Sequence, residues 1–193
     1  MKITTLLISI LLLMAATMVA QTKPAELTAV PLLDLNRYSG KWYEIAKYPN
    51  KFQKQCVGNT TATYTLKPSG RIEVANECLK KDGTTERAVG EAKIPNKSNN
   101  AKLKVRFAPK ALSFLPFVWA NYWVIELADD YSYAVIGEPG RDYFWILARK
   151  PSLDDKTYQN ILRRAETMGF VPGRVEKTPQ NAEAVKGAVL VRK

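Results

Sequence analysis

The sequence has no histidine and only two cysteines in 193 residues. Without imidazole, Ser-His-Asp and Cys-His catalytic arrangements cannot form, and haem or zinc sites that use histidine are excluded. Two cysteines cannot supply a four-thiolate metal site. We therefore expect no metal and no cofactor, and carboxylates, tyrosines and lysines remain as the candidate catalytic side chains.

Long hydrophobic runs are also scarce, and the one clear run, Leu6–Ala16, lies near the start of the chain. It follows the cation Lys2, is interrupted by Ser9 and leads into small residues that end at Ala20. This layout is typical of a cleavable signal peptide, here residues 1–20. A membrane anchor is the alternative, but an anchor needs about 20 consecutive apolar residues.

The predicted signal peptide indicates an exported protein, either periplasmic or secreted, which could associate peripherally with an outer membrane. No cysteine lies near the apolar run. The acylated cysteine of a bacterial lipoprotein is therefore not expected, and we predict a protein without a lipid anchor.

The remaining chain, residues 21–193, is long enough for one domain with a core. The net charge of the whole sequence is +11. A basic exported protein suggests an anionic partner, such as a membrane surface or an acidic head group. The alternative is solubility, because lysines and arginines are spread along the chain. That dispersion also argues against nucleic acid as a partner.

Alternating polarity predicts β-strands, most clearly in Lys102–Phe107, where every second residue is apolar and the others are cationic. Turn signals separate similar segments at short intervals, which is typical of an antiparallel barrel or sandwich with neighbouring strands paired in sequence order. Eight strands are predicted, at residues 41–48, 58–66, 71–79, 85–94, 102–107, 121–128, 131–137 and 142–149.

The pattern then changes to that of an amphipathic helix, which Ser152 could cap and which Gly169 would end. A helix with one apolar stripe must pack against another surface, here the outside of the barrel. Residues 174–177 could add a short strand, and the tail 179–193 is poorly defined. The stripe consists of Tyr158, Ile161, Leu162, Ala165 and Met168.

Three short motifs resemble the lipocalin family. Gly40 and Trp42 match its G-x-W motif, and Asp130 and Tyr131 match T-D-Y, although Asp replaces its Thr. Arg149 matches the family's third signature, a single arginine after the last strand. Within the family, the sequence is similar to bacterial lipocalins of the Blc type and to apolipoprotein D.

The resemblance, over about residues 34–178, implies an all-β fold, an eight-stranded antiparallel up-and-down β-barrel with one C-terminal helix packed outside. It implies that Arg149 packs over Trp42 at the closed end of the barrel. It also implies binding, storage or transport of a lipophilic ligand of the fatty acid or lysophospholipid class in the cell envelope, by a monomer or homodimer that is not an enzyme.

Two other functions remain open at this stage. One is a lipocalin-fold enzyme that acts on a bound lipid using Glu44 and Glu126, which are both expected inside the barrel. The other is a structural or interaction protein with a filled barrel.

Strand alternation, aligned with the family, predicts which side chains face the barrel interior. Small residues on some strands and aromatic residues on others would leave room for an acyl chain with a few polar anchors. A solid core is the alternative. Ala46, Tyr133 and Val135 are expected on the same inner face. The predicted ligand-binding residues are Glu44, Ala62, Val74, Asn76, Ala88, Leu103, Val105, Phe107, Tyr122, Val124, Glu126, Tyr143 and Trp145.

The two cysteines can be placed by the register of the second and third strands. A turn at residues 67–70 puts Cys78 opposite Asn59, which is three residues from Cys56. A Cys56–Cys78 disulfide is therefore geometrically reasonable in an exported chain. Two free thiols are the alternative.

The family topology places four loops at the open end of the barrel, and one of them, residues 111–119, is strongly apolar. Loops are normally exposed. This one could fold over the ligand, be buried in a dimer, or make transient contact with a membrane through Phe117 and Trp119. The four loops are residues 49–57, 80–84, 108–120 and 138–141.

Overall fold

A computed structural model describes residues 26–181 and Lys186 of the chain. The predicted signal peptide, residues 1–20, lies outside the described residues, as does most of the tail 179–193. Within the described part of the chain, no helix is long and apolar enough to cross a membrane.

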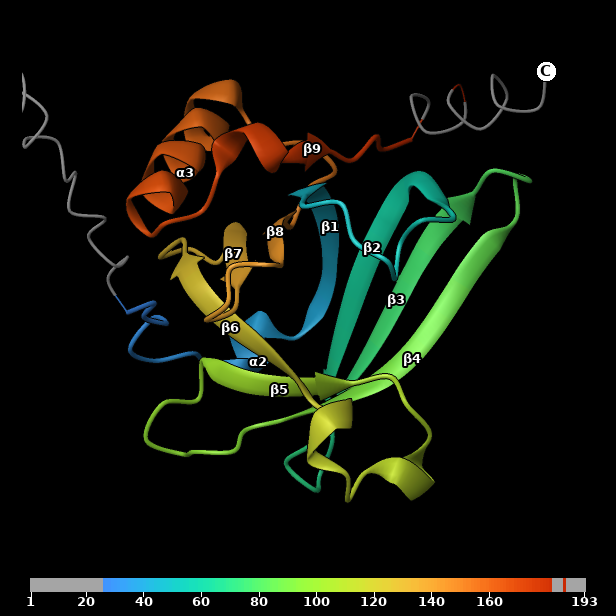
Figure 1. The fold of residues 1–193 in the computed structure, drawn as a ribbon, viewed down its shortest axis with the longest axis vertical. Coiled ribbons are helices and arrows are strands. Elements are labelled where there is room, and N and C mark those ends of the chain that lie inside the picture. Colours follow the sequence, from blue (N-terminus) through green and yellow to red (C-terminus); the bar gives the residue numbers. More distant parts are fainter. Residues whose placement is uncertain (1–25, 182–185, 187–193) are drawn as a thin grey trace, which may run out of the picture.

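The architecture is a closed antiparallel barrel in which strands β1 to β8 pair in sequence order and β8 pairs with β1 to complete the circle (Figure 1). The prediction of eight up-and-down strands is confirmed. The strands are β1 (Gly40–Lys47), β2 (Cys56–Leu66), β3 (Ile72–Lys80), β4 (Thr85–Lys93), β5 (Lys102–Arg106), β6 (Ala120–Leu127), β7 (Tyr133–Gly137) and β8 (Phe144–Ala148).

Two β-bulges change which side chains face inward. In β6 a register shift lies between Val124 and Glu126, so that Val124 is in the inner core whereas Glu126 pairs with Val135 and faces outward. Tyr133 packs against the outer core with Val135. A bulge in β1 likewise turns Ala46 outward. The inward predictions for these four residues are wrong. An extra residue reverses the alternation in β1 and β6, whereas β7 is regular and simply turns Ala134 and Ile136 inward in place of Tyr133 and Val135.

The β2–β3 hairpin differs from the predicted register by one residue, since Ala62 lies opposite Asn76 and not opposite Ala75. Two irregularities in the first half of β2 then shift its pairing again. The result brings Cys56 and Cys78 to a Cα–Cα distance of 5.6 Å, and the two residues form a disulfide. The predicted Cys56–Cys78 disulfide is confirmed, but the predicted β2–β3 register is wrong.

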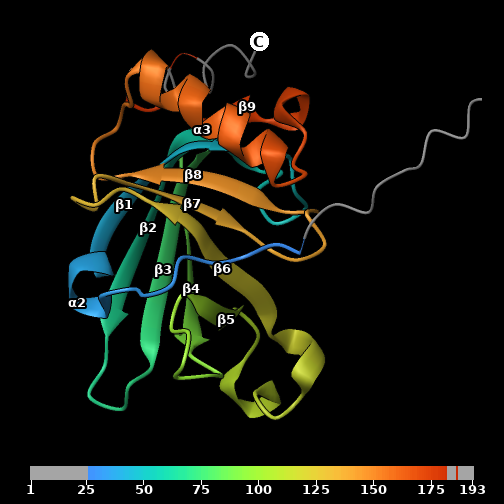
Figure 2. The same cartoon turned by 90° about the vertical axis from the view of Figure 1, so that its left-hand side faces the viewer.

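Helix α3 (Asp155–Thr167) lies on the outside of the barrel, above β8 (Figure 2). The amphipathic stripe is confirmed. The helix begins later than predicted, because the cap is Asp154, whose carboxylate accepts a hydrogen bond from the Thr157 amide, and not Ser152. The buried side of α3 and the outer faces of the strands form one core, which includes Ile45, Val135, Phe144, Ile146, Tyr158, Ile161 and Ala165.

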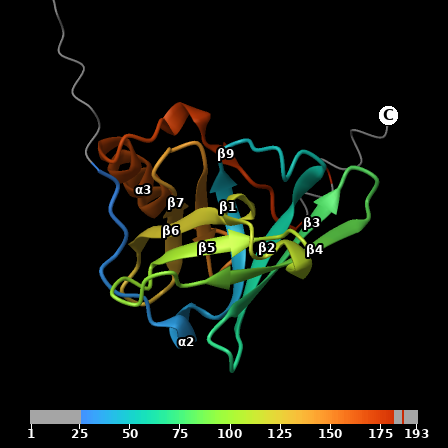
Figure 3. The same cartoon turned by 60° about the horizontal axis from the view of Figure 1, so that its bottom comes forward.

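The closed end of the barrel is covered by a short helix that the sequence analysis did not predict, α2 (Leu35–Tyr38), at the start of β1 (Figure 3). Trp42 is fully buried here, and its indole Nε1 donates to the Tyr38 carbonyl at 2.8 Å. The Arg149 guanidinium lies 3.8 Å from the centre of the Trp42 ring. The predicted Trp42–Arg149 packing is confirmed.

The C-terminal segment fills the other end of the seam between β1 and β2. The two strands pair directly only over Gly40–Tyr43 of β1, and β9 (Glu176–Lys177) pairs with β1 further along. The Gln180 amide then donates to the carbonyls of Glu44 and Thr60, one from each strand. Residues 176–181 therefore make the hydrogen bonds that β1 and β2 do not make with each other at this end. The start of the tail, residues 179–181, thus has a defined structure.

Candidate ligand-binding site inside the barrel

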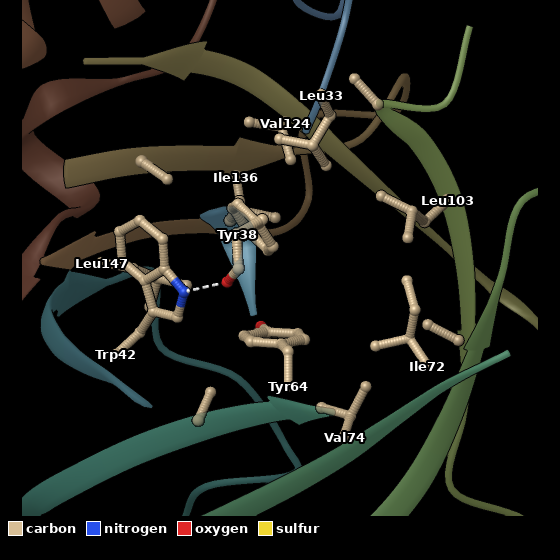
Figure 4. Close-up of a cluster of buried hydrophobic side chains, with 14 residues drawn as sticks. Leu33, Tyr38, Trp42, Tyr64, Ile72, Val74, Leu103, Val124, Ile136 and Leu147 are labelled. Atoms are coloured by element: carbon tan, nitrogen blue, oxygen red, sulfur yellow. Dashed lines mark hydrogen bonds between the residues drawn. The ribbon is translucent and has the colours of Figure 1, made fainter. Parts of the chain in front are cut away.

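Apolar side chains from all eight barrel strands meet inside the barrel, where those labelled in Figure 4 point toward one another. Most of the predicted wall is found here. Ala62, Val74, Leu103 and Val124 are buried members of this inner core, while Val105, Tyr122 and Trp145 are partly buried and pack against it. The arrangement presents aliphatic and aromatic surface of the kind that holds a hydrophobic ligand.

Three tyrosines form a polar cluster toward the closed end of this interior. The Tyr122 hydroxyl lies 2.7 Å from the Tyr38 hydroxyl and 2.7 Å from the Tyr64 hydroxyl. Burial raises the pKa of Tyr64 to about 12 and raises those of Tyr38 and Tyr122 well above their usual value. The phenols are therefore neutral near pH 7, and mutual hydrogen bonds allow their rings to line the interior without buried hydroxyls lacking partners.

Asn76 lies in β3, opposite Ala62 in β2 and Ala88 in β4. Its side-chain oxygen is buried and has no hydrogen-bond partner within the described residues. Ala88 itself is exposed, although it was predicted to line the site. This edge of the wall therefore contains an acceptor that a polar ligand group could satisfy.

Phe107 also lies at the edge and not in the core, with 43 % of its surface exposed. Its ring lies so close to Gly90 that a Cβ atom there would be 2.7 Å from the ring. Gly90, Phe107 and Lys110 help to line a hollow of about 330 Å³ at the β4–β5 edge. Phe107 thus contributes to the rim near β4 and β5.

Glu44 is the buried charge of the site, with 3 % of its surface exposed. Its Oε1 accepts from the Thr178 hydroxyl and its Oε2 from the Gln53 amide, both at 2.6 Å. Gln53 Oε1 in turn accepts from the Trp145 indole at 3.1 Å. Burial raises the Glu44 pKa, and the hydrogen bonds from Thr178 and Gln53 and the charge of Lys47 oppose that shift.

A Glu44→Gln variant tests this raised pKa. A carboxyl with a higher pKa in the folded state contributes stability below its unfolded pKa, and that stability is lost as pH rises toward the folded pKa. We expect the variant to unfold at a higher temperature than wild type at about pH 8, and at the same temperature at about pH 4. Each kcal/mol gained in the free energy of unfolding should raise the unfolding temperature by about 2–4 °C.

Thermal unfolding followed by circular dichroism checks this expectation. Glu73→Gln is the matched control, because Glu73 forms an exposed ion pair with Lys67 and its removal should change little. A Glu44→Gln protein that is less stable than wild type at about pH 8 would contradict the assignment, since the ionised carboxylate would then stabilise the fold.

Glu126, the second predicted inner carboxylate, lies on the outer face of the barrel. Its Oε2 accepts from Arg164 Nε of α3 at 2.9 Å, its Oε1 accepts from Arg164 Nη2, and the Tyr133 hydroxyl donates to it at 2.9 Å. Glu44 and Glu126 therefore face opposite sides of the barrel wall and do not form a paired-carboxylate site. Among the described residues, no group of three or more Cys, Asp or Glu could hold a metal ion.

Comparison with protein-family models finds a Lipocalin-like domain over residues 33–180. The chain belongs to the lipocalin family. It is 41 % identical over 162 residues to temperature-induced lipocalin-1 of Arabidopsis thaliana, covering 83 % of this chain and 86 % of that protein. It is 37 % identical to the outer membrane lipoprotein Blc of Escherichia coli K12, covering 77 % and 80 %. Apolipoprotein D of Rattus norvegicus is 41 % identical, covering 64 % and 65 %.

Solved structures show the same fold at low sequence identity. Insecticyanin from the tobacco hornworm Manduca sexta has a TM-score of 0.64 and 20 % identity, covering 84 % of this lipocalin and 88 % of insecticyanin. The cockroach allergen Per a 4 has a TM-score of 0.61 and 19 % identity, covering 80 % and 92 %.

The remaining signature residues of this lipocalin lie in the turn between β6 and β7. The Tyr131 backbone is in the left-handed region, with φ 62°, and its hydroxyl accepts from the Asp34 amide at 2.9 Å. The Arg37 guanidinium lies 3.9 Å from the centre of the Tyr131 ring, and the Asp130 side chain accepts from the Ser132 amide. Tyr131 thus fastens the N-terminal segment and α2 to the barrel, whereas Asp130 stabilises the turn itself.

An aromatic row extends from Trp145 toward the solvent. Tyr143 stacks on Trp145 with ring centres 5.8 Å apart and planes within 5°. Phe52 follows, 5.9 Å from Tyr143, and 61 % of its surface is exposed. Tyr143 and Trp145 were predicted from strand alternation, whereas Phe52 and Gln53 were missed because they lie in a loop.

The apolar loop 111–119 of this lipocalin contains two differently placed parts. Phe114 and Phe117 have 77 % and 80 % of their surface exposed. Trp119, named above as one possible membrane contact, is instead buried beside three cations. Lys93, Arg106 and Arg71 lie 4.0, 5.1 and 5.6 Å from its ring. Trp119 therefore attaches the loop to the barrel.

Proposed function

We propose that this lipocalin binds a lipophilic molecule of the lysophospholipid or fatty acid class inside its barrel and carries it. The observation that supports this most strongly is the polarity gradient along the inner wall. The closed end and middle contain apolar and neutral phenolic surface, including Val74, Leu103 and Tyr122, whereas Glu44 and Asn76 lie further along the wall. Such a gradient matches a molecule with an acyl chain and a polar head.

A carrier role also fits the position of the carboxylates. An enzyme that used Glu44 together with Glu126 would need both beside the ligand, yet only Glu44 faces the interior, where it bonds to Gln53. We therefore propose binding and transport without turnover of the ligand.

Native mass spectrometry of the purified protein, followed by lipid extraction, tests the carrier proposal. We expect one lipid per barrel to be retained or to bind when a lysophospholipid is added. A protein that neither retains nor binds a lysophospholipid or a fatty acid would contradict the proposal and would favour the filled-barrel alternative. The same spectra report whether the protein is a monomer or a homodimer.

We also propose that the protein is exported and functions in the cell envelope or outside the cell. The Cys56–Cys78 disulfide supports this proposal, because such bonds persist in oxidising compartments. The intact mass of the protein from an envelope fraction should correspond to a chain that begins at Gln21 without an added acyl group. A mass that retains residues 1–20 would contradict the predicted cleavage.

Transient membrane contact is a second proposed property, supported by the exposure of Phe114 and Phe117. Burying one such side chain stabilises an association by about 1.5–3 kcal/mol. Lys110 lies at the base of the loop, and the net charge of the protein is positive, so an anionic bilayer is the favoured surface. Contact at this loop would bring the barrel rim close to lipid.

Replacing Phe114 and Phe117 together with serine should weaken binding to phosphatidylcholine–phosphatidylglycerol vesicles by at least about tenfold, measured by co-sedimentation. Leu32 and Val171 provide the matched control, because both are exposed apolar residues outside the loop. Serine at these two control positions should leave vesicle binding unchanged. Equal losses in both double variants would show that the loop has no special role.

A further inference from the structure

The Glu44 carboxylate has two neutral donors but no cation in direct contact. Its hydrogen bonds come from Thr178 and Gln53, and no lysine or arginine of the described residues lies within 4.0 Å of it. Lys47, whose charge acts on it, pairs with Glu176 at 3.9 Å. A buried carboxylate without a counter-charge is unfavourable. A cation from a bound ligand would therefore stabilise the ionised Glu44 carboxylate.

The surroundings of Glu44 suit one kind of cation. Gln53 joins the carboxylate to the indole of Trp145, and Tyr143 and Phe52 continue the aromatic row toward the solvent. Aromatic faces attract ammonium groups, including quaternary ones that donate no hydrogen bond. A carboxylate at the inner end of an aromatic row is therefore complementary to an alkylammonium group.

We propose that the Glu44–Trp145 end of the barrel binds the ammonium of a zwitterionic lysophospholipid head group. The ammonium lies on the aromatic row formed by Phe52, Tyr143 and Trp145, with Glu44 as its counter-ion. This inference rests on the proposed function, and it selects one of the two ligand classes. A fatty acid would place its carboxylate beside Glu44, where like charges repel.

The loop that contains Phe52 also supplies positive charge for the phosphate of the same head group. Lys51 and Lys54 are exposed on this loop, and the Lys51 ammonium lies 5.4 Å from the centre of the Phe52 ring. The lysines lie toward the solvent and Glu44 lies inside the barrel. This arrangement is complementary to a head group whose phosphate points outward and whose ammonium points inward. The head group would therefore fold back along the row, with its phosphate toward the lysines.

The test compares three palmitoyl ligands by isothermal titration calorimetry: lysophosphatidylcholine, lysophosphatidylglycerol and palmitate. We expect lysophosphatidylcholine to bind wild type on the order of tenfold more tightly than the other two. Glu44→Gln should remove that preference without weakening lysophosphatidylglycerol. Glu73→Gln, which removes one carboxylate from an exposed pair, should retain it.

A second variant, Tyr143→Leu, tests the aromatic row independently of Glu44. It should weaken lysophosphatidylcholine more than lysophosphatidylglycerol, and it decides the outcome if Glu44→Gln does not fold. Equal binding of the two lysolipids by wild type, or a preference that survives both variants, would overturn the ammonium inference and leave lipid binding intact. Failure of all three ligands to bind would instead overturn the proposed function.

Discussion

Replacing Trp42 by alanine is expected to lower the free energy of unfolding by about 3–5 kcal/mol, the usual loss for a large aromatic side chain removed from a core. Trp42 is fully buried, and its indole donates to the Tyr38 carbonyl. The guanidinium of Arg149 would lose its aromatic partner, although it would keep its hydrogen bonds to the carbonyls of Lys41 and Arg37. Domains of this kind have about 5–15 kcal/mol in total, so a large share of the stability would be lost.

Urea denaturation followed by far-ultraviolet circular dichroism measures this loss. Trp123→Ala is the matched control, because Trp123 is a partly buried residue of the outer core, where Lys102 lies 4.1 Å from its ring. The control should lose clearly less stability. Equal losses at the two positions would mean that the closed end has no special role in holding the barrel together.

Replacing both Cys56 and Cys78 with serine is expected to reduce stability by roughly 3 kcal/mol, because the disulfide links residues 22 positions apart and constrains the unfolded chain. The β2–β3 ladder contains many other pairs, so the folded structure should persist. Thermal unfolding of the double variant should match that of wild type in reductant. Unchanged stability in both samples would show that the bond contributes nothing to folding.

Strand alternation predicted the barrel well because most strands keep one face on the core throughout their length. It failed in β1 and β6, where the backbone contains an extra residue, and in the regular strand β7, whose other face is the inner one. Nothing in the residue pattern around Val124 and Glu126 signals a bulge, since residues 122–125 are all aromatic or aliphatic and fit either face of the strand. The outward Glu126 is explained only by its partner Arg164, which is 38 residues away in the sequence.

The candidate site was predicted in part for a similar reason. Wall residues such as Leu103 and Val105 follow from the alternation of a regular strand. Gln53 and Thr178 contact Glu44 from a loop and from the C-terminal segment, where no periodic pattern places a side chain. The insertion of Gln180 between β1 and β2 likewise depends on a tertiary contact that short-range patterns do not encode.

The position of the acyl chain can be measured by fluorescence quenching with a lysophosphatidylcholine that carries bromine on the part of its chain next to the head group, which would pass Trp145 on entering the barrel, since bromine quenches only tryptophans close to it. Trp145 lines the interior and Trp123 packs in the outer core. If the chain lies inside the barrel, Trp145→Phe should remove most of the quenching at saturation, whereas Trp123→Phe should leave it unchanged. Quenching that depends on Trp123 and survives in the Trp145→Phe protein would place the lipid on the outer surface and contradict binding inside the barrel.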